Sequence, residues 1–257
     1  LVLSDPGFSP RVKTEKPDDH HGDRASDFMP VAIEPAANET VAVLRKLILD
    51  AQAVLESHPI NRRLAAEGRA AVNGIWPCGG GRAGAIMSLR DKYGISSAVI
   101  TAVDVIKGLG RCLGMDIIDV PGATGYIDTN FEGKADAAIK ALGTHDFVYL
   151  HLEAIDEVSH EKDLQKKIKA IEDFDARIVG RVLPAIGAEV NAAVLADHPV
   201  PVRIGRHTRK PVPVSVRMAG SGCDGVIRYD EISCLKGSLG AMHGPGLMDL
   251  LFGSIRP

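Results

Sequence analysis

The chain has 257 residues, of which 45% are hydrophobic and 25% charged, with 27 glycines and 15 prolines. These proportions are ordinary for a globular protein and exclude a disordered tail, a collagen-like rod and a long coiled coil. Lysine and arginine (30) nearly balance aspartate and glutamate (33), for a net charge of −3. Without a long run of like charge, the sequence does not favour nucleic acid as a partner. No apolar run approaches the roughly 18 residues of a membrane-spanning helix, so no membrane partner is expected.

The cysteines and the first residues indicate the compartment and the extent of the chain. The four cysteines are scattered and form no C-x-x-C pair, which is typical of free thiols in a reducing compartment, and we expect a cytoplasmic protein. The chain opens with Leu1 rather than Met and has no basic segment followed by an apolar core. We therefore expect that the numbered sequence begins inside a longer protein.

The first third of the chain predicts loops, one helix and one short strand. Residues 1–30 are polar and rich in glycine and proline, and are predicted to be loop. From Asn38 to about Leu64, apolar residues recur at three- and four-residue steps, which predicts an amphipathic helix. The sequence AAVNGIW (70–76) predicts a short buried strand that leads into a glycine-rich turn.

The rest of the chain alternates between predicted strands and helices. The strands are nearly continuous in apolar residues, which is typical of a parallel sheet covered on both faces, so we expect a three-layer, mostly parallel α/β fold. The predicted strands are Ser97–Val103, Met115–Val120, Asp146–Glu153, Asn191–Ala196 and Val212–Val216. The predicted helices are Asp104–Gly114, Gly133–Leu142 and Glu161–Leu183.

Side chains that bind metals follow two of these strands. Asp156 and His160 stand four residues apart after the third strand, Asp197 and His198 follow the fourth, and His207 comes nine residues later. Each group alone has a simpler interpretation: a salt bridge on a helix surface for the first pair, and a loop histidine for His207. Ligand sites in open parallel sheets, however, form beyond the carboxyl ends of the strands.

Taken together, three histidines and two aspartates offer a mixed nitrogen and oxygen ligand set suited to Mn²⁺ or Zn²⁺. Five ligands suit two neighbouring ions that share a phosphate, which predicts a paired-metal site for phosphoryl transfer. The glycine-rich segments 79–81 and 121–125 fit neither dinucleotide nor P-loop patterns, so no nucleotide cofactor is expected. They are interpreted as tight turns, with close approach of backbone to a phosphate as the alternative.

Several ordered blocks run from about Asn61 to the end of the chain. They are WPCGGG (76–81), AVDVIKGLG (102–110), VPGATGYIDTNFEGK (120–134), HLEAIDEVSH (151–160), DHPVP (197–201), RHTRKPVPV (206–214) and a closing YDE…G…GLMDLL pattern (229–251). Together these blocks resemble cofactor-independent phosphoglycerate mutase of the archaeal type, a family of the alkaline phosphatase superfamily.

The resemblance implies an alkaline-phosphatase-like sheet and an isomerase that acts on a small phosphorylated metabolite. Two divalent cations, most often Mn²⁺ with Zn²⁺, Co²⁺ or Mg²⁺ as alternatives, flank a serine that takes the phosphoryl group and returns it to the other hydroxyl. Asp156, His160 and His207 correspond to the ligands of one ion. Asp197 and His198 correspond to ligands of the other, together with the serine and an early aspartate.

Two basic residues are candidates for binding the substrate. Lys107, in the AVDVIKG block, is the candidate for the phosphate or carboxylate, with a simple helix-end lysine as the alternative. Arg11 stands where the resemblance places an arginine of an inserted substrate-binding domain.

The family's opening Asp-Gly turn and its nucleophilic serine are not found in this chain. We therefore expect residues 1–60 to be a remnant of an inserted α+β domain, and residues 61–257 to be a metal-binding core without its N-terminal half. Such a chain is expected to be inactive alone, and an uncovered sheet edge or apolar face favours self-association.

Small departures from the family pattern keep two other functions open. Ile155 replaces a usual proline and Val200 a usual threonine, but no ligand is lost. The alternatives are a metal-dependent phosphatase or phosphotransferase of the same superfamily with another substrate, or a catalytically inactive relative that keeps the fold.

Overall fold

A computed structural model of the protein describes residues 1–20 and 22–252. The chain forms two compact units, Leu1–Gly84 and Ala85–Pro257. Residues 61–84, which we assigned to the metal-binding core, pack with the first unit. The assignment of residues 1–60 to an inserted domain stays a prediction.

The first unit is built on one long helix that a proline divides from a short one. The predicted helix over 38–64 forms as α1 (Asn38–Ser57) and α2 (Pro59–Ala66). The break lies at His58 because Pro59 starts the second helix and the His58 ring accepts a hydrogen bond from the Ile60 N–H at 3.3 Å. The unit also contains an antiparallel pair, β1 (Val12–Lys13) and β2 (Val31–Ala32), and three short 3₁₀ helices, η1 (Pro17–His20), η2 (Ala25–Phe28) and η3 (Pro35–Ala37).

The strand predicted over 70–76 was wrong. The structure describes every residue from the end of α2 to Leu89 and shows no strand among them. The buried side chain of Asn61 donates to the Val72 carbonyl at 2.6 Å and accepts from the Val72 N–H at 3.0 Å. The amide of Asn61 thus satisfies backbone groups that a neighbouring strand would otherwise pair, and the segment remains irregular.

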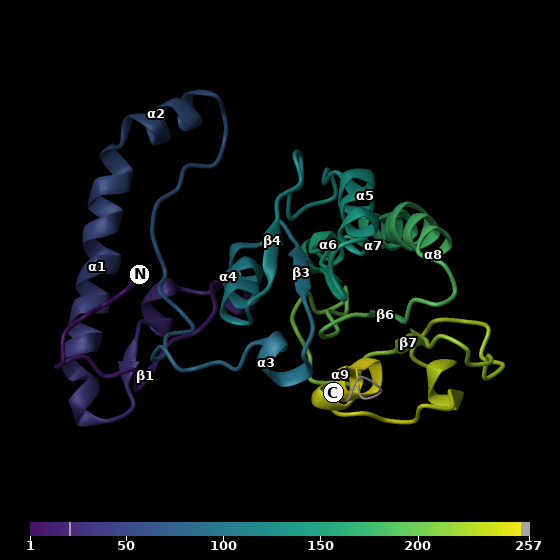
Figure 1. Ribbon diagram of the computed structural model, residues 1–257. Helices are drawn as coiled ribbons and strands as arrows, with labels where there is room; N and C mark the ends of the chain where they lie inside the picture. Colours follow the sequence, from purple (N-terminus) through teal and green to yellow (C-terminus); the bar gives the residue numbers. More distant parts are fainter. Residues whose placement is uncertain (21, 253–257) are drawn as a thin grey trace. The chain divides into compact units, whose positions relative to one another are not determined.

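The second unit is centred on a small parallel sheet of order β4-β3-β5. β3 (Ser97–Ile100) pairs with β4 (Asp116–Ile118) and with β5 (Phe147–Leu150), and all four residues of β3 are buried. Figure 1 shows α4 (Asp104–Cys112) on one side of this sheet and α5 (Phe131–Ala141) on the other. Gly110 permits the close approach of α4, since a Cβ there would lie 2.6 Å from the Val99 side chain. The predicted α/β class and these three strands are confirmed.

The last two predicted strands form, but they stand apart from the parallel sheet. β6 (Ala192–Leu195) and β7 (Val214–Arg217) pair with each other in antiparallel register. Within the described residues neither pairs with β5. The single, mostly parallel sheet that we expected is therefore present as a three-stranded parallel sheet and a separate antiparallel pair, because the loop after β6 returns the chain to pair directly with it.

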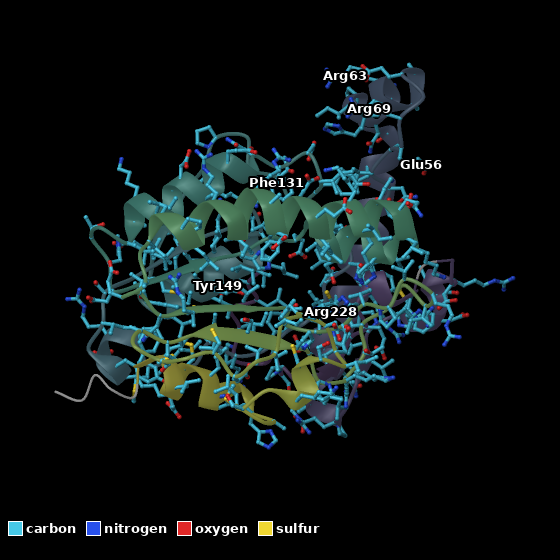
Figure 2. All side chains as sticks on the ribbon, turned by 90° about the vertical axis from the view of Figure 1, so that its right-hand side faces the viewer. Glu56, Arg63, Arg69, Phe131, Tyr149 and Arg228 are labelled. Atoms are coloured by element: carbon cyan, nitrogen blue, oxygen red, sulfur yellow. The ribbon has the colours of Figure 1, made fainter. Side chains whose placement is uncertain are left out.

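The predicted long helix over 161–183 forms as α7 (Leu164–Phe174), a π-helical turn, η4 (Asp175–Val179), and α8 (Gly180–Ala185). Its C-terminal half packs Phe174, Ile178 and Val182 around buried Phe131, the first residue of α5, which Figure 2 labels. Its N-terminal half leaves apolar side chains about half exposed: Leu164 (55%), Ile168 (43%) and Ile171 (46%). The remaining helices of the unit are α3 (Leu89–Tyr93), α6 (Ala154–His160), η5 (Cys234–Lys236) and α9 (Gly244–Phe252).

A second hydrophobic cluster, besides the one around Phe131, packs residues from the start of this unit against its last helix. Leu89, Ile95, Val99 and Met115 pack with Phe252 of α9, whose ring meets Phe147 edge to face at 5.2 Å. Within the described residues, no helix has both the length and the apolar character needed to cross a membrane. The cysteines are free thiols, of which Cys78, Cys112 and Cys223 are exposed.

Candidate metal centre

The short helix α6 places two of the predicted ligands on one face. It begins four residues after β5 ends, and its 3.6-residue period brings Asp156 and His160 together one turn apart. The Nε2 atom of His160 lies 3.2 Å from Asp156 Oδ2. The pair alone fits the simpler interpretation of a helix salt bridge, but its side chains are only 22% and 10% exposed.

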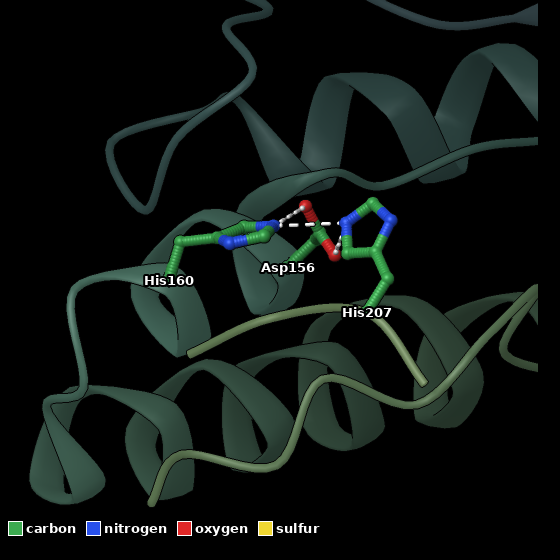
Figure 3. A group of neighbouring side chains, drawn as sticks. All are labelled: Asp156, His160 and His207. Atoms are coloured by element: carbon green, nitrogen blue, oxygen red, sulfur yellow. Dashed lines mark hydrogen bonds and ion pairs between the residues drawn. The ribbon is translucent and has the colours of Figure 1, made fainter. Parts of the chain in front are cut away.

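His207 arrives from a distant loop and completes a three-residue cluster. Its Nε2 atom lies 2.9 Å from His160 Nε2 and 3.5 Å from Asp156 Oδ1. Figure 3 shows the three side chains converging. Each of them offers one ligand atom, and these atoms lie within 4.8 Å of one another. The cluster thus has two imidazole nitrogens and one carboxylate, a set that suits Mn²⁺ or Zn²⁺.

The orientation of His160 is set by a backbone carbonyl. Its Nδ1–H donates to the Gly205 oxygen at 3.0 Å. This hydrogen bond fixes the tautomer and leaves the Nε2 lone pair directed at the cluster, as is usual for histidines that bind metals. Gly205 has a φ of +61°, and a Cβ there would lie 3.0 Å from the His160 carbonyl oxygen.

The predicted second ligand pair lies beside the first cluster. His198 Nδ1 is 3.9 Å from Asp156 Oδ1, and the His198 ring stacks on His207 with a 3.8 Å centroid separation. Asp197 Oδ2 lies 3.1 Å from His198 Nε2, and its side chain is 74% exposed. The structure therefore brings all five predicted ligands into one region and leaves Asp197 at its open side.

The loop that carries His198 and His207 is attached to helix α7. Lys167 donates its Nζ to the carbonyl of buried Val200 at 2.8 Å, and the N–H of Thr208 donates to the Pro199 carbonyl at 2.9 Å. Burial lowers the pKa of Lys167. The first bond attaches the loop to α7, and the second brings its two ends, next to His198 and His207, together.

Two buried atoms of the cluster fit a cation. Asp156 Oδ1 and His198 Nδ1 are buried and accept no hydrogen bond from the residues that the structure describes. The region is also crowded with acid: burial, followed by the charges of Asp156, Glu157 and Asp197, raises the pKa of Glu153 to about 6. A divalent cation would satisfy the unpaired atoms and relieve the repulsion between carboxylates.

Three further polar residues, near the ends of β3 and β5, were not selected from the sequence. His151 lies 3.1 Å from the hydroxyl of Thr101 and 3.2 Å from Glu153, and burial lowers the pKa of its imidazole. Thr101 and His151 directly follow the paired strands β3 and β5, so their place after a predicted strand was the available signal. Lys134 of α5 carries no such signal because a helical lysine is normally exposed.

Each of the two predicted substrate-binding residues pairs with a carboxylate of its own unit. Lys107 of α4 is paired with Asp119 at 2.6 Å. Arg11 lies in the first unit, with its side chain 61% exposed, and pairs with Glu34 at 3.8 Å. Their role in substrate binding stays a prediction.

Comparison with known families agrees with the ligand set. Residues 39–253 match the family described as "Metalloenzyme superfamily". The chain belongs to this superfamily. Membership is consistent with a cluster of histidine and aspartate ligands at the edge of a small parallel sheet.

Within the metalloenzyme superfamily, the chain is homologous to archaeal-type 2,3-bisphosphoglycerate-independent phosphoglycerate mutases. It is 41% identical to that mutase of Methanosarcina acetivorans over 98% of this chain and 63% of the relative, and 42% identical to that of Methanothrix thermoacetophila over 91% and 59%. The chain therefore spans about 60% of the length of these relatives.

Two solved structures are similar in fold to this chain. A protein of Pyrococcus horikoshii matches with a TM-score of 0.72 and 31% identity, over 87% of this chain and 60% of that one. A cofactor-independent phosphoglycerate mutase of Thermoplasma acidophilum matches with a TM-score of 0.55 and 27% identity, over 98% and 62%.

Proposed function

We propose that this chain supplies the metal-binding part of a phosphoglycerate mutase that interconverts 2- and 3-phosphoglycerate. The observation that carries the proposal is the convergence of Asp156, His160 and His207, with a buried Asp156 oxygen that lacks a hydrogen bond. The names of the homologous mutases support the substrate. The fold proposed for the whole protein is the three-layer sheet of the alkaline phosphatase superfamily.

The ligands divide between two divalent cations, for which Mn²⁺ is the proposed metal. Asp156, His160 and His207 hold one ion, and Asp197 with His198 contributes to the other. When bound, the ions supply Lewis-acid stabilisation of the charge on a transferring phosphoryl group. The chain's own residues position the ligands: Gly205 fixes His160, and Lys167 holds the loop that carries both other histidines.

The attacking group in this proposal is a serine outside the present chain, which takes the phosphoryl group and returns it to the other hydroxyl. The second ion's ligand set is correspondingly incomplete here, since among the described residues it consists of exposed Asp197 and half-buried His198. Lys107 and Arg11 are proposed to bind the substrate's phosphate or carboxylate.

A second candidate function is a metal-dependent phosphatase or phosphotransferase with another substrate. It is favoured by the breadth of the matched family, whose description specifies a metalloenzyme and no substrate. The two candidates differ in product, since a phosphatase releases free phosphate whereas a mutase keeps the phosphoryl group on the sugar acid.

The test is an assay of the full-length protein expressed from its complete gene. We expect Mn²⁺-dependent interconversion of 2- and 3-phosphoglycerate that His207→Ala abolishes, because the substitution removes one of three ligands. The matched control is His243→Ala, which removes an exposed histidine of the same unit and is expected to leave the rate unchanged. Activity that persists after chelation of metal contradicts the proposal, and release of free phosphate from a panel of phosphorylated compounds supports the second candidate.

A further inference from the structure

Lys134 is a buried cation without an anionic partner in direct contact. It lies in the first half of α5 and is only 1% exposed. Its Nζ donates one long hydrogen bond, 3.4 Å, to the carbonyl oxygen of Thr124, and within the described residues it forms no ion pair. An ammonium group has three N–H donors, and burying one without compensation is costly. The side chain therefore has donors to spare for a ligand.

The surroundings of Lys134 connect it to the candidate metal centre. The negative charge of Glu153 acts on Lys134 and opposes the lowering of its pKa by burial. Carboxylate oxygens of Glu153 and Asp156 lie within 4.8 Å of each other. Gly125, next to the Thr124 that Lys134 contacts, lies against Glu153, since a Cβ on Gly125 would be 3.9 Å from the Glu153 side chain. Lys134, the Thr124–Gly125 backbone, Glu153 and Asp156 therefore form one continuous region.

The loop above Lys134 is built to keep this shape. Asn130 donates to the Pro121 carbonyl at 2.9 Å and accepts from the Gly133 N–H at 2.9 Å, which joins the loop to the start of α5. The Thr124 N–H donates to the Thr129 hydroxyl at 3.0 Å. Pro121 and Gly122 are exposed and Ala123–Tyr126 are half-buried. The loop therefore covers the Lys134 ammonium, and a bound anion would take the place of the weak contact with the Thr124 carbonyl.

Lys134 also contrasts with the lysine predicted from the sequence. Lys107 already has a carboxylate partner, Asp119, at 2.6 Å. Lys134 has a single carbonyl partner and feels the negative charge of Glu153, which neighbours Asp156. A substrate anion gains more from an ammonium that has lost its water and has no counter-ion than from one that must first release a carboxylate.

We propose that Lys134, with the Thr124–Gly125 backbone beside it, forms an oxyanion subsite next to the Asp156–His160–His207 cluster. Its ligand is a phosphoryl or carboxylate group of the phosphorylated substrate. The proposal rests on the proposed function, because it assigns a second contact to the substrate of that metal centre.

The test uses Lys134→Met, which keeps the length of the aliphatic stem and removes the charge. Binding of inorganic phosphate and of glycerate is measured by calorimetry on the protein, with and without Mn²⁺. We expect the affinity for at least one anion to fall about tenfold or more, since hydrogen bonds to charged groups are worth that much, and the anion affected identifies the group that binds. The control is Lys140→Met, an exposed lysine of the same helix, which is expected to leave both affinities unchanged.

A thermal melt of the same variants separates binding from a structural role. Because Lys134→Met removes a buried charge without an ion-pair partner, we expect an unchanged or raised melting temperature. An unchanged affinity for both anions, or no anion binding by the unsubstituted protein, overturns the inference. Mn²⁺ binding with unaltered affinity for both anions in Lys134→Met overturns this inference alone. Anion binding that depends on Lys134 in a protein that binds no Mn²⁺ supports the subsite and contradicts the proposed function.

Discussion

The two ligand groups of the candidate centre differ in how firmly the fold holds them. In the first, Asp156 and His160 share a helix, and the Gly205 carbonyl fixes the His160 ring. In the second, Asp197 is 74% exposed, and the contacts of its carboxylate are with His198, the next residue. A ligand whose orientation is fixed in advance loses less freedom when a metal binds. The comparison teaches that the first group is preorganised for an ion and that the second needs ligands from elsewhere to be so.

Among the variants that test this comparison, Gly205→Ala is expected to have the largest effect, a loss of Mn²⁺ affinity at the first ligand group. The new Cβ would lie 3.0 Å from the His160 backbone oxygen and 2.8 Å from Lys162, at a φ of +61°. The resulting shift breaks the hydrogen bond that orients His160. We expect the Mn²⁺ affinity to fall about 10- to 100-fold, the usual cost of losing a group that supports a metal ligand, as measured by titration with electron paramagnetic resonance.

The matched control is Gly220→Ala. Gly220 has a φ of +74° with no atom within 4 Å of an added Cβ. The variant therefore carries the same backbone strain without the collision, and we expect its Mn²⁺ affinity to equal that of the unsubstituted protein. Equal losses in the two variants would show that general destabilisation, and not the orientation of His160, weakens the first group.

A smaller effect, on stability, is expected from Glu153→Gln. Burial and neighbouring acids raise the pKa of Glu153 to about 6, above its usual 4.5. The ionised carboxylate therefore opposes folding above pH 6, and this penalty disappears below about pH 4.5. We expect the variant to raise the free energy of unfolding of the metal-free protein by about 1–2 kcal/mol at pH 7.5, and to have no effect at pH 4.5, as measured by denaturant titration.

Glu132→Gln is a control for which we expect the free energy of unfolding at pH 7.5 to fall instead of rise. Arg177 lowers the pKa of Glu132 to about 2 through paired hydrogen bonds at 2.6 and 2.7 Å. Ionised Glu132 therefore stabilises the fold above pH 4.5, and the variant is expected to be less stable at pH 7.5. A Glu153→Gln protein that is destabilised at pH 7.5 would contradict the crowding of acid around the first group.

Much of the central fold could be predicted from apolar runs. The runs within 97–103, 115–120 and 146–153 contain β3, β4 and β5. The central strand β3 is buried throughout and needs apolar residues at every position, whereas β4 and β5 are partly exposed. The strand predicted around Val72 failed because a single side chain, Asn61, takes up its backbone hydrogen bonds. Sequence periodicity contains no information about such a distant partner.

In the candidate site, too, some residues could be predicted from the sequence and others could not. Asp156, His160, His198 and His207 could be selected because they follow predicted strands and are chemically suited to metals, and the structure brings them together. Gly205 and Lys134 could not be selected in this way. What distinguishes them are tertiary contacts: the Gly205 carbonyl bonds to the His160 ring, and the buried Lys134 side chain contacts the Thr124 carbonyl of a loop.

The most direct test of the account is the Mn²⁺ affinity of this chain measured side by side for the unsubstituted protein, Asp156→Asn and Asp197→Asn. The account predicts one tight Mn²⁺ site, which Asp156→Asn weakens at least about tenfold by removing a charged ligand and which Asp197→Asn weakens much less. Equal affinity in Asp156→Asn and the unsubstituted protein, or a larger loss in Asp197→Asn, would contradict it.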